Sequence, residues 1–140
     1  MTLPRHGDFV TRAAELARTA HAGQFRRDGV TPYIRHPEAV AARVAGDPVA
    51  EATAWLHDVL EDTDTTVENL RERQIPEEVI ACVLALTNKG DIGYERYLDR
   101  IRASPVAKKV KIADMLANLS DHPSDRQIVK YAKGLLVLMG

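Results

Sequence analysis

The run AWLHDVLEDT, residues 54–63, holds four ionisable side chains within six positions: His57, Asp58, Glu61 and Asp62. The other positions of the run are mostly apolar, which is typical of a helix that packs into a core. Residues three and four apart share one face of a helix, so the spacing predicts one acidic stripe beside an imidazole. A carboxylate stripe with a histidine on so apolar a helix indicates a site for a divalent cation.

A second apolar segment, from Pro105 to about Asp121, has the same anomaly. Lys111, Asp114, Asn118 and Asp121 follow one another at spacings of three, four and three, and they form a polar stripe on a helix that is otherwise hydrophobic. A buried aspartate without a partner would shift its pKa or destabilise the fold by several kcal/mol. Asp114 therefore needs a cation nearby, and the metal site would supply it.

Combining the two segments with His36 gives two imidazoles and two carboxylates from three separate helices. The candidate ligands are His36, His57, Asp58 and Asp114. Mixed nitrogen and oxygen ligands with open positions suit Mn²⁺ or Fe²⁺, and Zn²⁺ is compatible with the same ligand types. Such a centre leaves room for water and a phosphate oxygen, which is the arrangement for metal-assisted hydrolysis.

The elements that must position these residues are predicted to be helices. We expect an ordered loop at GQFRRDGVTPY because it contains two glycines and a proline. Caps and prolines mark the helix starts. The expected helices are 8–22 with Asp8 as N-cap, one from His36 as N-cap, one from Asp47–Pro48 that includes His57, one at a capping box of Thr65 with Glu68, Pro76 to about Thr87, one around 94–101, Pro105 to about Asp121, and 125–138 with a capping box of Ser124 and Gln127.

No alternating run indicates a strand, and we find no internal repeat, low-complexity tract or linker. The sequence therefore predicts an all-α fold, a single compact helical bundle over residues 1–140. The C-terminal run KYAKGLLVLMG has enough apolar residues either to pack on the core or to pair with a second subunit, so a homodimer stays open.

Composition restricts the partners. The formal net charge is −1, so no overall field recruits nucleic acid or an anionic membrane. No segment reaches the roughly 18 to 20 apolar residues that span a bilayer, and we expect a cytoplasmic protein without a membrane partner. The single cysteine, Cys82, makes a disulfide within the chain impossible. An anionic ligand must be met locally, by arginines or by a metal.

Four motifs occur in order over residues 20–121: AHAGQFRRDGVTPYIRHPEAVA, AWLHDVLEDT, LALTNKG and VKIADMLANLSD. In these the sequence resembles the HD-domain phosphohydrolases, and within them the hydrolase domain of the RelA/SpoT alarmone enzymes in its free-standing small form. The resemblance implies an all-α HD fold and one Mn²⁺ ion held by His36, His57, Asp58 and Asp114. It also implies hydrolysis of the 3′-pyrophosphate of guanosine tetra- or pentaphosphate (ppGpp, pppGpp), which yields GDP or GTP and pyrophosphate.

The resemblance also assigns catalytic roles. Glu61 and Asp62 match the family's Glu-Asp pair, which orients and activates the attacking water. The physical argument agrees, because both lie one turn beyond the ligands His57 and Asp58 and are free to act as base or orienter.

Substrate contacts follow from the same motifs. Arg26 and Arg27 match the basic pair on the loop beside the nucleotide, where a guanidinium can stack on a base or pair with phosphate. Asn118 matches the asparagine that contacts the ribose. Lys111 and Tyr97 are further candidates to line the site, although Lys111 is equally suited to an ion pair with Asp114 and Tyr97 to packing.

Two positions depart from the family pattern. Long RelA/SpoT proteins usually carry Arg and His where this chain has Met115 and Ala117. The difference favours the free-standing form and leaves the preference for guanine or adenine open. The alternatives are therefore an HD phosphohydrolase that acts on an adenosine alarmone (pppApp) or on the phosphate of NADPH, and a module that binds a nucleotide without turnover. The Glu61-Asp62 pair argues against the last, because binding an anion does not need two carboxylates.

Overall fold

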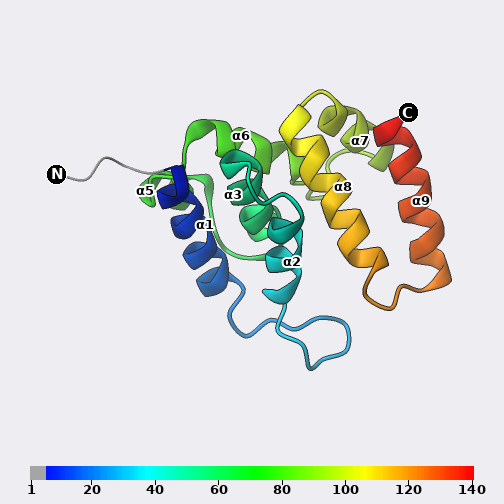
Figure 1. The fold of residues 1–140 in the computed structure, drawn as a ribbon, viewed down its shortest axis with the longest axis horizontal. Helices are drawn as coiled ribbons and strands as arrows, with labels where there is room; N and C mark the ends of the chain where they lie inside the picture. Colours follow the sequence, from blue (N-terminus) through cyan, green and yellow to red (C-terminus); the bar gives the residue numbers. More distant parts are fainter. Residues whose placement is uncertain (1–5) are drawn as a thin grey trace.

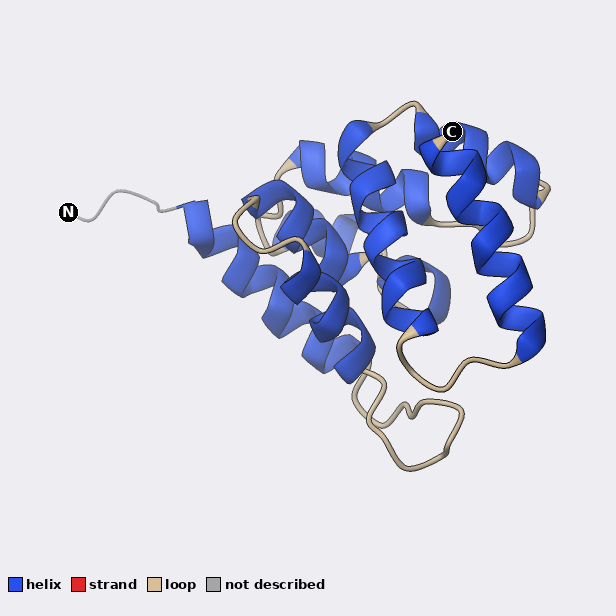
Figure 2. Ribbon diagram, turned by 45° about the vertical axis from the view of Figure 1, so that its right-hand side comes forward, coloured by secondary structure: helices blue, strands red, loops and turns tan. Residues whose placement is uncertain are grey.

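The computed structural model describes residues 6–140, with side chains from Phe9 onward. Over this range the chain forms nine helical segments and no strand (Figure 2), so the predicted all-α class is confirmed. The helices are α1 (His6–Ala20), α2 (Arg35–Arg43), α3 (Pro48–Leu56), α4 (Val59–Asp62), α5 (Val67–Glu72), α6 (Glu77–Leu86), α7 (Tyr94–Arg102), α8 (Pro105–Leu119) and α9 (Asp125–Met139).

Helix α3 is the centre of the bundle. It packs against α1, α2, α6 and α8, while α7 and α9 cover the opposite side of α8 (Figure 1). Ala50, Ala52 and Ala54 of α3 are fully buried, and their small side chains let the neighbouring helices approach closely. Leu56 at the end of α3 is also fully buried, so the residue directly before His57 is anchored in the core.

The predicted start signals of three helices are confirmed. Asp47 caps α3 by accepting a hydrogen bond from the backbone N–H of Ala50 at 3.2 Å. Helix α8 begins at Pro105, with Ser104 as its N-cap. Ser124 and Gln127 form the expected reciprocal capping box at the start of α9. These local side chains satisfy backbone donors that the first turn leaves unpaired.

Three other predicted caps are wrong. Helix α1 begins at His6, two residues before Asp8. The capping box of α5 is Thr66 with Asn69 rather than Thr65 with Glu68, because Thr66 is the residue in the extended conformation that a cap requires (φ −109°, ψ 166°).

His36 is likewise not an N-cap. Helix α2 begins one residue earlier, at Arg35, and its N-cap is Ile34. The backbone N–H of His36 already donates to the carbonyl of Tyr33 at 2.9 Å, so the chain turns before the histidine. Pro37 is tolerated in this first turn because its missing N–H would have no partner within the helix. His36 is buried and directed into the protein.

The run 54–63 is not one continuous helix, contrary to the prediction. Helix α3 ends at Leu56 and α4 begins at Val59, so His57 and Asp58 form the corner between them. In an uninterrupted helix the carbonyl of Ala54 would accept the N–H of Asp58. Here that carbonyl accepts the Nδ1–H of the His57 ring at 2.6 Å and the His57 backbone N–H at 3.5 Å. The side-chain hydrogen bond thus competes with the helix and aims both residues inward.

The C-terminal helix α9 packs on the core with part of its surface. Gly134 and Leu138 are buried, and a Cβ atom on Gly134 would lie 2.7 Å from Cε of Met115 on α8. The other face of α9 includes Leu136 and Met139, which are 75% and 67% exposed. In the described part of the chain, none of the helices combines the length and apolar character needed to cross a membrane.

We expect Leu56→Ala to destabilise the protein by about 2–5 kcal/mol, because it removes a fully buried side chain and leaves a cavity beside the His57 corner. Urea denaturation followed by circular dichroism measures this loss. Leu136→Ala is the matched control, since its side chain is largely exposed and its truncation should leave the unfolding midpoint nearly unchanged. Equal losses in the free energy of unfolding in the two variants would contradict the burial of Leu56 in the core.

Candidate metal centre and active site

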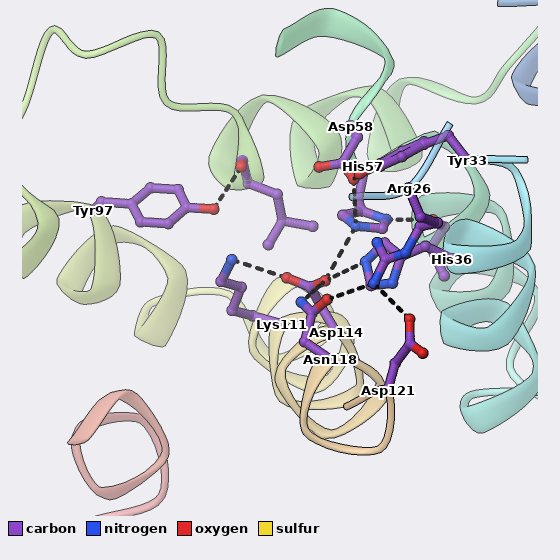
Figure 3. Close-up of polar contacts among 12 residues, drawn as sticks. Arg26, Tyr33, His36, His57, Asp58, Tyr97, Lys111, Asp114, Asn118 and Asp121 are labelled. Carbon is purple, nitrogen blue, oxygen red and sulfur yellow. Dashed lines mark hydrogen bonds and ion pairs between the residues drawn. The ribbon is translucent and has the colours of Figure 1, made fainter. Parts of the chain in front are cut away.

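The four predicted metal ligands lie together although they come from three parts of the chain. His36 is on α2, His57 and Asp58 are at the α3–α4 corner, and Asp114 is on α8 (Figure 3). Nε2 of His36 lies 2.7 Å from Oδ1 of Asp114. Nε2 of His57 lies 3.1 Å from Oδ2 of Asp58 and 3.5 Å from Oδ1 of Asp114. Two imidazole nitrogens and two carboxylates therefore converge on one point.

The His57 ring tests whether this donor set fits a metal. Its Nδ1–H donates to the carbonyl of Ala54, so the neutral ring directs the lone pair of Nε2 at Asp58 and Asp114. Nε2 is buried and has no hydrogen-bond partner. A lone pair that faces two carboxylates is repulsive unless a proton or a metal cation lies between them. These residues thus fit a divalent ion, which prefers this mixture of nitrogen and oxygen ligands.

The pKa values reflect the same concentration of charge. Burial opposes protonation of His57, yet the carboxylates of Asp58 and Asp114 hold its pKa well above the ordinary value. Burial also favours the neutral form of Asp58, but the neighbouring His57 lowers its pKa to about 2. Each carboxylate is therefore available as an anionic ligand near neutral pH.

Asp114 has the largest number of polar neighbours in the centre. Besides His36, it accepts hydrogen bonds from Nζ of Lys111 at 3.0 Å and from Nδ2 of Asn118 at 3.3 Å. Burial favours its neutral form, but Lys111 and the histidines outweigh it and hold the pKa of Asp114 well below its usual range. The ammonium of Lys111, the residue proposed as a substrate contact, is thus engaged in an ion pair with Asp114.

Tyr33 is a residue of this centre that sequence reasoning missed. Its phenolic O–H donates to Oδ2 of Asp58, and its ring packs against His21 with 4.8 Å between centroids. The sequence signal was its place in TPYIRHP, directly after a proline that restricts the backbone four residues before His36. A hydrogen bond of this kind orients a ligating carboxylate.

Glu61 and Asp62 lie beside Asp58 rather than within the buried cluster. One carboxylate oxygen from each of these three residues lies within 4.8 Å of the others. The backbone N–H of Asn88, in the loop after α6, donates to Oε1 of Glu61 at 2.7 Å. Partial burial raises the pKa of both Glu61 and Asp62, and the charge of Asp58 adds to this effect. Raised pKa values make both carboxylates better proton acceptors.

A cavity of about 320 Å³ joins the acidic residues to the predicted substrate contacts. It lies over α8, with the α3–α4 corner on one side and α9 on the other. Its lining residues are Phe25, Arg26, Arg27, Tyr33, His36, Asp58, Glu61, Asp62, Asp114, Asn118, Gln127 and Tyr131. Phe25 and the two α9 residues were not anticipated, because nothing local in the sequence places α9 beside this cavity.

The structure brings Arg26, Arg27 and Asn118 to this cavity. The Arg26 guanidinium donates to Oδ1 of Asn118 and to Oδ2 of Asp121, at 3.2 Å each, and its side chain is 15% exposed. Arg27 is exposed at the rim. Tyr97, the other suggested lining residue, is buried and donates its O–H to the carbonyl of Leu86 at 2.6 Å, which is a packing role.

Residues 13–133 match the HD domain family, and the chain belongs to that family. The predicted resemblance is thereby confirmed, and HD-domain hydrolases bind a divalent metal. The chain is similar to guanosine-3′,5′-bis(diphosphate) 3′-pyrophosphohydrolase of Aquifex aeolicus, with 39% identity over 127 residues. That match covers 83% of this chain but only 18% of the relative.

Two further proteins match this chain over most of their own length. The guanosine-3′,5′-bis(diphosphate) 3′-pyrophosphohydrolase MESH1 of Mus musculus is 39% identical over 123 residues, which is 80% of this chain and 68% of the relative. A solved structure of a metazoan orthologue of SpoT that hydrolyses ppGpp superposes with a TM-score of 0.77 at 24% identity. It covers 99% of this chain and 86% of that chain, so the two share the fold.

We expect Tyr33→Phe to weaken Mn²⁺ binding by roughly 10- to 100-fold, because Asp58 loses the hydrogen bond that orients its carboxylate. Isothermal titration calorimetry of the metal-free protein measures this affinity directly. Tyr97→Phe is the control, since it also deletes a hydroxyl hydrogen bond, but one to the carbonyl of Leu86 away from the cluster. Unchanged Mn²⁺ affinity in Tyr33→Phe would refute the orienting role.

Proposed function

We propose that this protein removes the 3′-pyrophosphate of ppGpp or pppGpp by hydrolysis, yielding GDP or GTP and pyrophosphate. One Mn²⁺ ion would be held by His36, His57, Asp58 and Asp114. The observation that carries the proposal is the buried Nε2 of His57, which faces two carboxylates next to the Glu61-Asp62 pair. Two relatives are named guanosine-3′,5′-bis(diphosphate) 3′-pyrophosphohydrolases, and the metazoan SpoT orthologue that hydrolyses ppGpp shares the fold. We further propose that residues 1–140 work as one hydrolase domain.

The chemistry combines a Lewis acid with a proton acceptor. A divalent ion held by these residues would supply the Lewis acid, which polarises a phosphoryl oxygen and lowers the pKa of water. Glu61 has Oε1 fixed by the Asn88 N–H, so its second oxygen, Oε2, is free to accept the proton of the attacking water. Asp62 lies beside it and orients that water. The water oxygen bonds to the phosphorus next to the ribose and the bond from that phosphorus to the ribose 3′ oxygen breaks. The 3′ oxygen takes up a proton, which balances the one that Glu61 accepts from water, and pyrophosphate and the nucleotide with a free 3′-hydroxyl are released.

Local groups must hold the anionic remainder of the substrate, because the net charge of the chain gives no general attraction. Arg26 and Arg27 supply two cations at the cavity, and Asn118 supplies an amide above α8. The carboxylate of Asp121 is 55% exposed, so water screens its ion pair with Arg26 and the pair contributes little. A phosphate can therefore replace Asp121 as its partner, and the guanidinium offers paired donors that match phosphate oxygens.

We expect the purified protein to bind about one Mn²⁺ ion per chain and to release pyrophosphate from ppGpp, as one bound ion suffices for this chemistry. Asp58→Ala should abolish both, since it removes a ligand. Metal binding is measured by calorimetry and products by nucleotide chromatography. Intact ppGpp after incubation with excess Mn²⁺ would refute the proposal, and binding without product would instead support a non-catalytic module.

Glu61→Gln separates proton transfer from metal binding. We expect it to lower kcat by roughly 10²- to 10⁴-fold, which is the usual contribution of a general base, while Mn²⁺ affinity stays close to wild type. The amide keeps an oxygen that can accept the Asn88 N–H, so the local structure should persist. Steady-state kinetics and the calorimetric titration are compared on the same preparations. Full activity of Glu61→Gln would exclude Glu61 as the base.

A further inference from the structure

Helix α9 contributes one wall of the cavity. Of the described residues that line it, Gln127 and Tyr131 come from α9 and lie one helical turn apart. Helix α9 packs on α8 on the side away from α2 and α3 (Figure 1). The acidic wall, with Glu61 and Asp62, and the α9 wall therefore face each other across α8, and Asn118 on α8 lies between them.

The order of acidic wall, Asn118 and α9 wall determines which end of the substrate reaches α9. This inference rests on the proposed function. With the 3′-pyrophosphate at the acidic wall and the ribose over Asn118, the base lies toward Gln127 and Tyr131. The ring of Tyr131 is half-buried and offers a flat apolar surface of the kind on which bases stack. Burial raises its pKa, as does the charge of Asp114, while the cationic Arg26 and Arg27 oppose the shift from nearby.

The capping box determines what Gln127 can offer a base. The Ser124 backbone N–H donates to Oε1 of Gln127 at 3.0 Å, and Ser124 Oγ accepts the Gln127 N–H at 3.2 Å. A backbone N–H can only donate, so the side-chain atom that meets it must be the amide oxygen. The Nε2 amino group, with two hydrogens, is thus the part of Gln127 left for a ligand. Gln127 is a donor at this wall.

A hydrogen-bond donor on the protein can distinguish guanine from adenine. Guanine presents two acceptors, O6 and N7, on one edge, whereas adenine presents the acceptor N7 beside the N6 amino donor. We propose that Gln127 selects guanine over adenine by donating from Nε2 to the O6/N7 edge of the base. Hypoxanthine has the same O6 and N7 acceptors and lacks the 2-amino group, so it should be accepted as guanine is.

Gln127→Glu tests this while keeping the helix start. Glutamate is as good a partner as glutamine for serine in a capping box, so α9 should still begin at Asp125. The carboxylate, however, has no donor for O6. We expect wild type to bind GDP and IDP with similar dissociation constants, each about tenfold below that of ADP, as one base-edge interaction provides. In Gln127→Glu the preference for GDP and IDP over ADP should be lost or reversed, because the carboxylate has nothing to donate to O6 but can accept from the N6 amino group of adenine.

Asn69→Asp is the matched control. Asn69 has the same place in the capping box of α5 and lies away from this cavity, so the substitution adds the same charge to an equivalent cap. It should leave the GDP preference intact, and thermal unfolding should show both variants folded. Calorimetry with GDP, IDP and ADP in the presence of Mn²⁺ gives the dissociation constants.

The outcomes separate the inference from the proposed activity, because binding and turnover are measured independently. A GDP preference that Gln127→Glu removes supports the inference even if ppGpp is not hydrolysed. Equal binding of GDP and ADP by wild type, no binding of any of the three, a preference retained in Gln127→Glu, or IDP behaving like ADP would each overturn it. Hydrolysis of ppGpp by wild type would still stand in those cases.

Discussion

The buried carboxylate of Asp114 is the interaction on which the rest of this structure depends. It lies on α8 inside the bundle, where an unpaired charge would destabilise the fold by several kcal/mol. His36 from α2, Lys111 one turn before it and Asn118 one turn after it all contact its oxygens. The contact with His36 holds α2 against α8. The contact with Asn118 holds that side chain where Arg26 can reach it. The candidate metal centre and the packing of α2 against α8 therefore share one charge.

The acidic run at the α3–α4 corner shows how a break in a helix serves a site. Had residues 54–63 formed one helix, His57 and Asp58 would point in directions set only by helical spacing. The hydrogen bond from the His57 ring to the carbonyl of Ala54 ends α3 early and fixes which nitrogen faces the carboxylates. Asp58 is then free to meet both His57 and the phenol of Tyr33. Glu61 and Asp62 follow on a separate short turn, near the cluster but outside it.

Much of the fold and part of the candidate site could be predicted from the sequence, and the failures have two physical causes: competing local hydrogen bonds and contacts between distant segments. Helix starts marked by a local cap, such as Asp47 and Ser124, were predicted correctly because the stabilising contact lies within four residues. The convergence of His36 with Asp114 could be anticipated because a buried charge demands a partner. The break at His57 and the start of α2 before His36 come from local hydrogen bonds, from the His57 ring to Ala54 and from the His36 N–H to Tyr33, that compete with the regular helix. The roles of Tyr33 and Gln127 depend on contacts between distant segments. Periodicity and local propensity carry no information about such contacts.

The close approach of Gly134 to Met115 also bears on how this domain can vary among its relatives. A β-carbon at position 134 would meet the end of the Met115 side chain at 2.7 Å, so the two residues fill one space between α8 and α9. A larger residue at 115 must find room beside Gly134, and a side chain at 134 requires the flexible end of Met115 to move. Positions 115 and 134 should therefore change together across homologous chains. An arginine at 115 would then accompany a differently seated last helix and a differently shaped pocket.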